Sequence, residues 1–474
     1  MMITKTDFIA FLDAPRHLWA LKNNKLSEKE INVFIQHLFD QGYEVEEQAE
    51  KYIQNILIPS YKIDPDNVFL QPTHIHGNFQ ARTDVLIKNV KTNKWDIYEI
   101  KSTNDVKKTH KFDATFQYLV FRESYDIGTL NILHLNKEYV RSGDVSLSEL
   151  FTVSDITEEV SKLTDEVIEL RQEAFTTAQK NNLQSADKCI KPKECPCLDI
   201  CHPDLPDYSI YDINRLSANV AKMRDLIDQG IESVFDVPKD FSLSKIQRFQ
   251  VDVAQNNKVE IDSNKIQKDL SGVIYPLYFI DYESYNPAIP MYDGYKPFDQ
   301  MPFQWSLHIQ QQGRELEHFE FIETSQIDPI PNFLTELQKH IGKEGSLIVW
   351  NKSFEGTQNK RMAEIHPQFA DFCLNMNERI YDLMDIFQKQ WYADPKLKGS
   401  YSIKNVLPLF APDFSYNELE IGEGATAMTS WFEMVYENAE TSKKETIKEN
   451  LLRYCEMDTM AMLKIYTILK YLIK

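Results

Sequence analysis

Acidic side chains occur in the second half of the chain at spacings that suit divalent-cation chemistry. Asp281 and Glu283 directly follow the apolar run 274–280, and a β-strand there would put both side chains on one face. Two carboxylates this close repel each other unless a cation lies between them. Phosphodiester hydrolysis by two metal ions needs such a set of carboxylates, which holds the ions about 3.5–4 Å apart. These residues therefore predict a site for Mg²⁺ or Mn²⁺.

Three residues later in the chain complete this candidate set. Glu355 would add a third carboxylate from a helix that follows a short apolar strand. Asp458 would add a fourth from the C-terminal helix, and Tyr454 precedes it by one turn, so both project from one helical face. The Tyr454 phenol is suited to orienting the attacking water. We therefore expect catalysis from this set, with its four carboxylates as metal ligands.

A second set of residues with related chemistry lies in the first half of the chain. Asp84 and Glu99 would occupy adjacent strands and hold the same kind of cation, and Lys101 would share a strand face with Glu99. A lysine in that position can orient or deprotonate water. Lys107 and Lys108 follow closely, and they fit either a local nucleic-acid track or a solvated loop.

Four of the six cysteines are concentrated between residues 189 and 201. This density is typical of a metal ion or an iron–sulfur cluster, with redox disulfides or unrelated buried thiols as the alternative. The predicted ligands are Cys189, Cys195, Cys197 and Cys201. Cys373 and Cys455 are predicted to be unrelated, buried single cysteines. Four histidines have no ligand-like spacing and are predicted to be structural, namely His308, His318, His340 and His366.

Helical and β patterns alternate around the first set. Residues 28–57 have helical spacing, with a buried stripe expected at Phe34, Leu38, Val45, Ala49 and Ile53. Strands are expected at 83–87, 95–100 and 129–135, with a turn at 91–94 and a helix at 113–122. This order predicts a mixed α/β unit.

The second set lies in a part of the chain that begins with three strands. A polar helix at 156–180 leads to the cysteines, and residues 208–270 are expected to form a helical connector. Strands are expected at 274–280, 303–309 and 318–322, after which helices and strands alternate. This order predicts an RNase H-like sheet. The expected fold class is therefore α/β, with two mixed α/β domains joined by the connector.

The composition limits the class of protein and the kind of partner. A chain of 474 residues is too long for one hydrophobic core, and its 42% hydrophobic content suffices for two or three. The net charge of −20 disfavours a broad basic surface for duplex DNA, but it permits a narrow channel because bound cations reverse the sign of a carboxylate cluster. Signal-peptide patterns and apolar runs of about 20 residues are missing, so we expect a cytoplasmic protein without a membrane partner.

The second set resembles the DnaQ-like exonuclease family, over residues 271–474. The family motifs D-x-E, N-x-x-F-D and Y-x-x-x-D match Asp281 to Glu283, Asn351 to Glu355, and Tyr454 to Asp458. Glu355 departs from the usual aspartate; it keeps the carboxylate but reaches further, which puts the metal geometry in question. The resemblance implies 3′-to-5′ exonuclease activity.

Neighbouring residues fit the same family. Residues 380–383 look like the strand after the central helix that often carries a further acid, here Asp382, although Asp382 and Asp385 are equally explained as solvated acids. Residues 400–406 resemble the start of the family's next helix, with Ser402 as a cap and Lys404 as a nucleic-acid contact.

The first set resembles the D…E-x-K signature of the PD-(D/E)xK, restriction-endonuclease-like nucleases. Gln117 to Phe121 is similar to the Q-x-x-x-Y helix of the RecB-like exonucleases, which include CRISPR-associated members. Phe121 keeps the ring of the usual tyrosine without its hydroxyl. The resemblance implies a nucleic-acid contact at Gln117 and a further acid on the N-terminal helix, at Glu46 or Glu47.

Iron–sulfur members of the RecB-like group carry three cysteines after the nuclease core and a fourth in an N-terminal C-P-R context. Here that context is Ala14-Pro15-Arg16, and the downstream group has one extra cysteine, assigned to Cys197. The fourth ligand has therefore moved, or the cluster has been lost. A 4Fe-4S cluster is the first expectation and Zn²⁺ the second, because all four cysteines are local.

The order of these parts resembles an uncharacterised bacterial family that joins a RecB-like nuclease to a DnaQ-like exonuclease. The expected domains are a PD-(D/E)xK nuclease with its cysteine cluster at 1–207, the connector at 208–270 and an RNase H-like exonuclease at 271–474. The resemblance implies hydrolysis of DNA or RNA, in repair or anti-phage defence. Two alternatives stay open: only one site is active, or the chain is a non-catalytic nucleic-acid-binding or assembly subunit.

Overall fold

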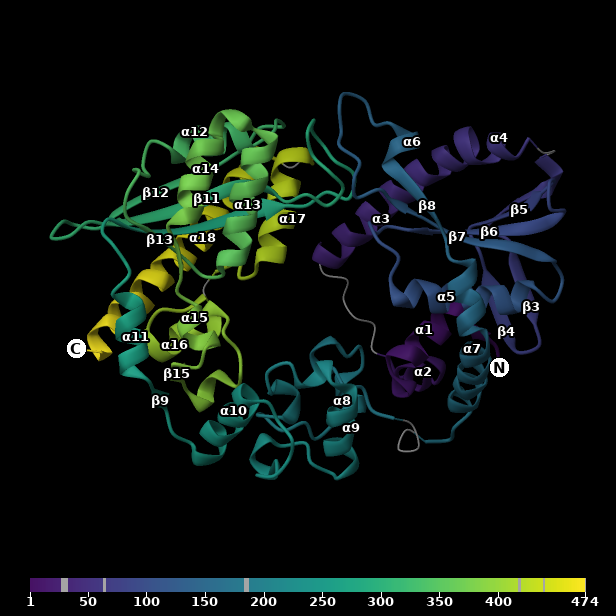
Figure 1. Ribbon diagram of the computed structural model, residues 1–474, viewed down its shortest axis with the longest axis horizontal. Coiled ribbons are helices and arrows are strands. Elements are labelled where there is room, and N and C mark those ends of the chain that lie inside the picture. Colours follow the sequence, from purple (N-terminus) through teal and green to yellow (C-terminus); the bar gives the residue numbers. More distant parts are fainter. Residues whose placement is uncertain (27–32, 63–64, 183–186, 417–418, 438–439, 474) are drawn as a thin grey trace. The chain divides into compact units, whose positions relative to one another are not determined.

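Two compact units make up the chain in a computed structural model, which describes residues 1–26, 33–62, 65–182, 187–416, 419–437 and 440–473 (Figure 1). Unit 1 comprises residues 1–205 and 287–298, and unit 2 comprises residues 206–286 and 299–474. Each unit combines helices with a mixed sheet, so the predicted two-part α/β fold class is confirmed.

A five-stranded sheet forms the centre of unit 1, in the order β2-β5-β6-β7-β8. Its strands are β2 (Val68–Leu70), β5 (Val85–Asn89), β6 (Lys94–Lys101), β7 (Ile127–Leu135) and β8 (Phe151–Asp155). β6 and β7 are parallel, and the other neighbours are antiparallel. A smaller sheet contains β1 (Ile3–Thr4), β4 (Phe79–Arg82) and β3 (Thr73–His76).

Helices cover both faces of the five-stranded sheet. Leu86 and Ile132 face a core that they share with α1, α5 and α7, whereas the adjacent Val85 and Leu133 face α3. This alternation is the period-2 pattern of strands that are buried on both faces. The helices are α1 (Lys5–Asp13), α2 (Pro15–Lys22), α3 (Val33–Tyr52), α4 (Ile58–Tyr61), α5 (Lys108–Phe121), α6 (Leu147–Leu150), α7 (Thr157–Ala178) and α8 (Leu198–Cys201).

The buried stripe of α3 differs from the predicted one. Val45, Ala49 and Ile53 are buried as predicted. Leu38, however, is 49% exposed, and the polar residues His37 and Gln41 are buried in the first half of the helix. The His37 and Gln41 Nε2 atoms lie 2.8 Å apart, and Gln41 Oε1 accepts a hydrogen bond from the Ala288 amide. The prediction was wrong here because hydropathy cannot reveal that a polar pair is hydrogen-bonded inside the unit.

A second five-stranded sheet forms the centre of unit 2, in the order β12-β11-β10-β13-β14. The strands are β10 (Leu277–Tyr285), β11 (Met301–Gln310), β12 (Glu317–Ile322), β13 (Ser346–Val349) and β14 (Ile380–Asp382). The first three are antiparallel neighbours, and β13 and β14 are added in parallel. Three strands followed by α/β alternation is the arrangement that the sequence predicted.

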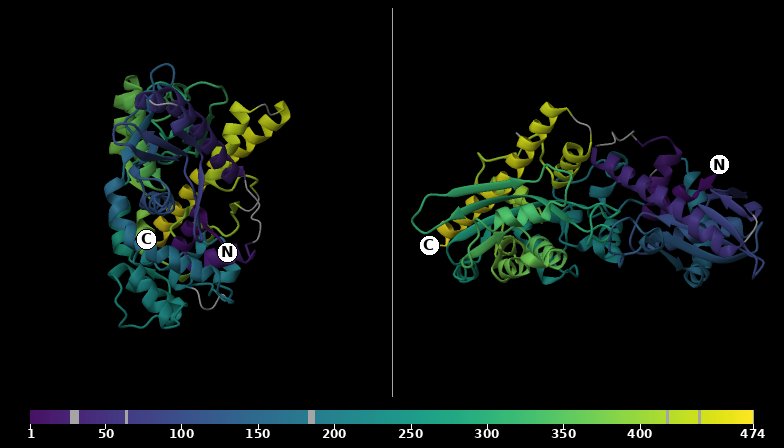
Figure 2. Two further views of the ribbon diagram at one scale, coloured as in Figure 1. Left: turned by 90° about the vertical axis from the view of Figure 1, so that its right-hand side faces the viewer. Right: turned by 90° about the horizontal axis from the view of Figure 1, so that it is seen from above.

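Helices also cover both faces of this sheet. α12, α13 and α14 lie on one side, and α17 and α18 lie on the other (Figures 1 and 2). The helices of the unit are α9 (Val220–Asp228), α10 (Lys245–Asn256), α11 (Ser263–Leu270), α12 (Ile330–Leu337), α13 (Lys352–Ile365), α14 (Ala370–Glu378), α15 (Asp385–Gln388), α16 (Ile403–Phe410), α17 (Gly424–Tyr436) and α18 (Thr441–Leu472).

Residues 206–270 are largely helical and belong to unit 2. They also contain β9 (Glu260–Ile261), which pairs with β15 (Tyr392–Ala393). None of the helices in the described ranges combines the length and the apolar character that a membrane crossing requires.

Candidate functional site

The acidic pair of β10 faces α17 and α18. Tyr282 points to the other side of the sheet, where its hydroxyl donates a hydrogen bond to Asn359 Oδ1 of α13 at 3.2 Å. Asp281 and Glu283 therefore share the opposite face. β10 pairs with β11 along its length but with β13 only over residues 277–279, so the pair lies where the sheet opens.

α18 brings the next two predicted residues to the same place. Asp458 and Tyr454 are both buried and lie one helical turn apart. The Tyr416 hydroxyl donates to Asp458 Oδ1 at 2.5 Å, and Lys404 Nζ donates to the Tyr454 hydroxyl at 3.3 Å. Lys404 also donates to the Gly422 carbonyl oxygen at 2.5 Å. Sequence analysis missed Tyr416, because nothing in its spacing connects it with α18.

Negative charge is concentrated and buried in this set. Burial and the charges of Asp458, Glu283 and Glu355 raise the pKa of Asp281 well above its ordinary value. Burial raises the pKa of Glu355 to about 8 and that of Asp458 to about 6. Glu355 Oε2 is buried and has no hydrogen-bond partner among the described residues. A divalent cation would supply both the missing positive charge and the missing partner, so the donor set fits Mg²⁺ or Mn²⁺.

Cys455 belongs to this site, although the sequence predicted an unrelated cysteine. It is fully buried, as predicted, but its Sγ lies 3.6 Å from Asp281 Oδ2. Cys455, Asp281 and Glu283 each offer a ligand atom within 4.8 Å of the other two. Burial raises the pKa of the Cys455 thiol well above its ordinary value. The thiol is therefore a neutral donor beside the carboxylates.

A strained turn brings Glu355 to the site at the start of α13. Asn351 has a φ of +114°, in a region that side chains other than glycine rarely adopt. The Asp382 carboxylate accepts the amides of Asn351 at 3.2 Å and Lys352 at 2.8 Å. Asp382 therefore fixes this turn, whereas Asp385 forms an ion pair on the surface of its own helix.

A pocket of about 460 Å³ opens beside Asp281 and Asp458. Its lining includes the aromatic residues Trp350 and Tyr401 and the cation of Lys404. Aromatic rings stack with bases, and a lysine attracts phosphate, so this lining has the chemistry to hold a nucleotide.

The sequence made predictions for the starts of two helices, a side-chain cap for α16 and exposed lysines for α5. Ser402 occupies the N-cap position of α16, but its side chain makes no capping hydrogen bond, so the predicted cap was wrong. Lys107 and Lys108 at the start of α5 are exposed, and Lys108 Nζ lies 5.3 Å from the centre of the Phe112 ring. Exposed lysines here are compatible with both interpretations of this stretch.

In unit 1, β6 places Glu99 and Lys101 side by side. Lys101 Nζ lies 2.9 Å from Glu99 Oε1 and 2.6 Å from Asp113 Oδ2 of α5. Asp84 directly precedes β5, and its Oδ2 accepts the Ile100 amide at 2.7 Å. The structure therefore brings together the three residues that the sequence proposed and adds Asp113.

Lys5 of α1 is a second cation at this site, which spacing along the chain did not reveal. Its Nζ lies 2.5 Å from Glu99 Oε1, while Glu99 Oε2 is buried without a hydrogen-bond partner in the described part of the chain. Gln117 is fully buried and donates to Asp113 Oδ1 at 3.0 Å. It therefore orients a carboxylate, and a side chain with no exposed area cannot contact nucleic acid directly.

Crowded carboxyl groups at this site raise the pKa of Asp84 and keep Lys101 charged. Burial and the charge of Glu99 raise the pKa of Asp84 to about 7. Burial lowers the pKa of Lys101, but the charges of Glu99 and Asp113 outweigh this effect and raise it above its ordinary value. Lys101 is therefore charged at neutral pH, which suits positioning of water or phosphate better than proton abstraction.

A pocket of about 230 Å³ connects this site with α3. Glu46, Glu50 and Asp84 are among the residues that line it. Glu47 instead pairs with Lys51 at 2.8 Å on the exposed side of α3. Of the two positions proposed for the further acid, Glu46 is the one that faces the site.

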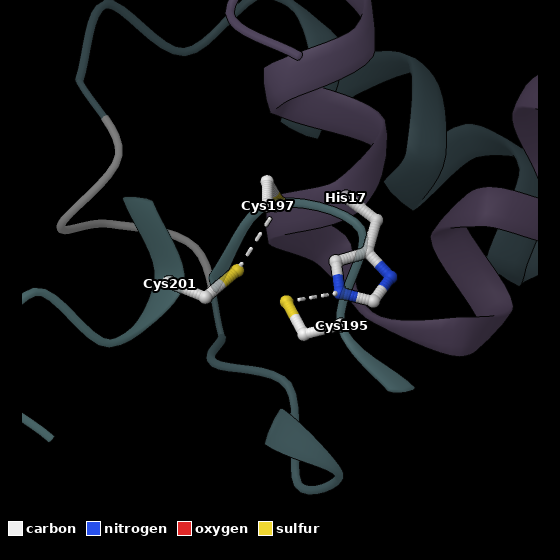
Figure 3. Close-up of side chains that lie close together, drawn as sticks. All are labelled: His17, Cys195, Cys197 and Cys201. Atoms are coloured by element: carbon white, nitrogen blue, oxygen red, sulfur yellow. Dashed lines mark hydrogen bonds between the residues drawn. The ribbon is translucent and has the colours of Figure 1, made fainter. Parts of the chain in front are cut away.

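His17 and three cysteines converge elsewhere in unit 1 (Figure 3). His17 Nε2 lies 3.3 Å from Cys195 Sγ, and Cys197 Sγ lies 3.5 Å from Cys201 Sγ. The four donor atoms lie within 4.8 Å of one another, and all four residues are buried. This cluster could therefore hold a metal ion. All six cysteines of the chain are free thiols.

His17 takes the place that the sequence gave to Cys189. The Cys189 Sγ is buried nearby but accepts the Lys191 amide at 3.3 Å and lies outside the four-donor group. Cys197, which was assigned as the extra cysteine, lies inside it. Ala14 packs against the cysteines, and His17 lies three residues later on α2. His17 is thus the fourth donor of the cluster, and its position directly after Ala14-Pro15-Arg16 is a local signal that the sequence offered for it.

The surroundings of the cluster suit a bound cation. Burial raises the pKa of Cys195 to about 12, so a cation must displace a proton to bind this thiol. His17 Nδ1 faces the Asp13 carboxylate at 3.8 Å. Histidines that bind metals commonly present their second nitrogen to a carboxylate, which orients the ring.

Sequence comparison relates part of the chain to proteins of unknown function. Residues 278–402 match the domain of unknown function DUF2779. The matched range includes nearly all of β10 and all of α13, and it ends just before α16. The chain is 29% identical over 289 residues to the uncharacterized protein UU173 of Ureaplasma parvum, covering 56% of this chain and 41% of that protein. It is 26% identical over 239 residues to the uncharacterized protein MG366 of Mycoplasma genitalium, covering 47% and 35%. The chain spans less than half the length of these curated relatives.

Among solved structures, the crystal structure of SSO0001 is similar at 14% identity, with a TM-score of 0.25. The similarity covers 43% of this chain and 87% of that chain.

Proposed function

We propose that the chain is a divalent-metal-dependent nuclease that hydrolyses phosphodiester bonds in DNA or RNA, with a 3′-to-5′ exonuclease site in unit 2. The observation that carries this proposal is the convergence of four carboxylates from β10, α13 and α18. Burying like charges is costly, and a divalent cation bound between them would offset this cost. The adjoining pocket has aromatic and basic side chains that suit a nucleotide substrate.

Each residue of this set has a distinct role in the proposal. The metal ligands are Asp281, Glu283, Glu355 and Asp458. Mg²⁺ or Mn²⁺ held there would supply the chemistry of water activation and charge neutralisation on the phosphate. Tyr454, held by Lys404, orients that water, and Tyr416 fixes the Asp458 carboxylate. Trp350 and Tyr401 hold the terminal base.

The site of unit 1 supports a second nuclease activity by the same kind of chemistry. Asp84, Glu99 and Glu46 are the proposed metal ligands there, because Glu99 presents a buried unpaired oxygen and the other two share a pocket. Lys101 remains protonated and positions the water or the phosphate.

One observation favours a non-catalytic nucleic-acid-binding role for unit 1. Lys101 already bridges Glu99 and Asp113, and Lys5 adds a second positive charge to Glu99. A degenerate site whose ion pairs have been kept for stability would have the same arrangement. In that case unit 1 positions the substrate and unit 2 cleaves it.

We propose that the cluster of His17, Cys195, Cys197 and Cys201 binds a single metal ion, with Zn²⁺ as the first choice. A tetrahedral zinc ion with sulfur about 2.3 Å away places neighbouring donors about 3.8 Å apart. The observed separations of 3.3 Å, 3.5 Å and at most 4.8 Å suit one ion. A 4Fe-4S cluster attaches each ligand to a different iron and spreads them further, so it becomes the second choice. The free thiols fit a cytoplasmic, reducing location.

The optical absorption spectrum of the purified protein distinguishes the two metals. A colourless protein that contains zinc supports the single ion, and broad visible absorption with bound iron and sulfide supports the cluster.

The decisive experiment for unit 2 follows the degradation of end-labelled single-stranded DNA and RNA with Mg²⁺ or Mn²⁺. Wild type is compared with Asp281→Asn, and with Asp385→Ala as a matched control that removes a surface carboxylate. We expect a 3′-to-5′ ladder that disappears only in Asp281→Asn. Equal degradation by all three proteins would assign the cleavage to unit 1, and no degradation by wild type would favour the binding role.

A further inference from the structure

Two histidines that the sequence presented as structural meet a carboxylate on α18. His308 of β11 and His318 of β12 are directly opposite each other in the antiparallel register. Their rings stack with centres 4.3 Å apart, and His318 Nδ1 lies 3.8 Å from Glu456 Oε1. The three residues each offer one ligand atom within 4.8 Å of the other two. Residues ten positions apart on neighbouring strands and a third on a distant helix share no sequence motif, which explains why spacing alone missed them.

Two hydroxyl groups hold the outer nitrogens of both rings. Thr459 Oγ1 lies 2.9 Å from His308 Nδ1, and Ser306 Oγ lies 3.0 Å from His318 Nε2. The two hydroxyls also lie 2.9 Å from each other, and both residues are fully buried. Metal-binding histidines are typically oriented in this way, with one nitrogen on the metal and the other in a hydrogen bond. His308 Nε2 and His318 Nδ1 are thus the nitrogens presented to a ligand.

Exposure differs across the cluster in a way that suits an open metal site. His308 is 1% exposed, whereas the side chains of His318 and Glu456 are 25% and 45% exposed. An ion would therefore rest on a buried imidazole and remain accessible to solvent on its outer side. Glu320 lies two residues from His318, on the same face of β12, and adds negative potential near Glu456.

We propose that His308, His318 and Glu456 bind one transition-metal ion of the zinc class, with solvent as the remaining ligand. Two imidazoles and one carboxylate suit Zn²⁺ and similar borderline ions, and they are a poor set for Mg²⁺, which prefers oxygen ligands. The site is separate from the carboxylates of β10 and from the cysteine cluster. It does not depend on the proposed nuclease activity.

Because Glu456 lies on α18 beside residues of the acidic site, an ion bound to it would also affect the structure of that site. Glu456 lies between Cys455, which contacts Asp281, and Asp458, which joins the acidic set. An ion that links Glu456 to β11 and β12 therefore fastens α18 to the sheet at the level of the acidic residues. Tyr454 and Asp458 would be positioned by this link without touching the ion.

Metal content of the full chain tests the proposal. Wild type, His318→Ala and Glu456→Gln are dialysed against a small molar excess of Zn²⁺ with a large excess of Mg²⁺, and bound zinc is measured by mass spectrometry. The excess of Mg²⁺ competes for the carboxylate sites, and zinc at the cysteine cluster is common to all variants. We expect each variant to bind one zinc equivalent less than wild type. The matched control is His340→Ala, since His340 stacks on Phe319 outside the cluster and its loss leaves the zinc content unchanged.

Thermal unfolding gives a second readout that does not use activity. Zinc raises the melting temperature of wild type and His340→Ala by more than that of His318→Ala or Glu456→Gln, because a ligand bound only to the folded state stabilises it. Both substituted residues are partly exposed, and far-ultraviolet circular dichroism verifies that the variants fold. Equal zinc content and equal melting shifts in all four proteins would overturn the proposal and leave the histidine pair as a hydrogen-bonded structural cluster.

Discussion

His17 decides what the buried cysteine cluster can bind. It supplies the only nitrogen among the four convergent donors of the described chain, and its ring is oriented toward Cys195. We expect His17→Ala to weaken metal retention at least about tenfold, since even residues that only support a ligand contribute that much. His17→Cys retains the metal, because a thiolate is an equally good tetrahedral ligand. Metal content after dialysis against a chelator measures both effects.

The control for this prediction is His76→Ala, which removes an exposed histidine of β3 in the same unit. It should retain metal as wild type does. Full retention by His17→Ala would show that Cys189 completes the site instead.

Glu355 makes the stability of the metal-free protein depend on pH. Burial raises its pKa from 4.5 to about 8, so between these values the folded chain binds a proton that the unfolded chain has released. The stability contributed by this proton is fully present below pH 4.5 and is lost as the pH rises through 8. The free energy of unfolding should fall by up to about 1.4 kcal/mol per pH unit in this window.

Urea unfolding in metal-free buffer across this window measures the effect. Glu355→Gln should have a shallower dependence, because an amide does not ionise, and added Mn²⁺ should restore the stability of wild type at the upper end. An identical pH dependence in wild type and Glu355→Gln would contradict the assignment.

Residues within one motif could be predicted from the sequence, but contacts between distant elements could not. The strand period placed Asp281 with Glu283, and Glu99 with Lys101, because neighbours two apart share a face. Lys5, His17, Tyr416 and Cys455 reach their sites through tertiary packing, and no spacing along the chain encodes that. Only His17 had a local signal, since it follows the Ala14-Pro15-Arg16 context.

The start of helix α13 is held by a side chain from the end of β14. Asp382 accepts the amides of Asn351 and Lys352 and so stabilises the strained turn at the start of the helix. We expect Asp382→Ala to lower the free energy of unfolding by about 1–2 kcal/mol, as for loss of a helix cap. It should also reduce the proposed exonuclease activity, because Glu355 lies in the first turn of α13.

Asp385→Ala is the matched control for that prediction. Its surface ion pair with Lys389 is worth less than about 1 kcal/mol, so stability and activity should be nearly unchanged. Denaturant unfolding of both variants separates the two cases. Equal destabilisation would mean that Asp382 is an ordinary solvated acid.

Strands were easier to predict than helix faces. Five strands coincide closely with expected ones, because side chains that alternate between two faces leave a pattern in adjacent residues: β5, β6, β7, β11 and β12. β2 and β8 were not among the expected strands, and β10 extends beyond residue 280, where it was expected to end. The first half of α3 buries His37 and Gln41, and because these residues are polar, hydropathy does not identify them as buried. Residues 287–298 belong to unit 1 although they connect two strands of unit 2. No local sequence pattern indicates that a connecting segment packs in the other unit.

At the scale of the whole molecule, each candidate active site is complete within one unit. Asp84, Glu99 and Lys101 belong to unit 1, whereas Asp281 and Asp458 belong to unit 2. A full set of ligands inside each unit implies that neither site needs residues of the other. The two proposed activities should therefore be separable by single substitutions in the intact chain.

We expect Lys101→Met to reduce one activity about 10²–10⁴-fold and to leave 3′-end degradation intact. Glu283→Gln should have the converse effect, and the double variant should be inactive. Product lengths from labelled single- and double-stranded DNA and RNA distinguish the two activities. Lys137→Met is the control for lost charge, since it removes only a surface pair with Asp105. If Lys101→Met unfolds near the wild-type temperature yet changes no cleavage product, the ion pairs of Lys101 are structural and unit 1 binds the substrate that unit 2 hydrolyses.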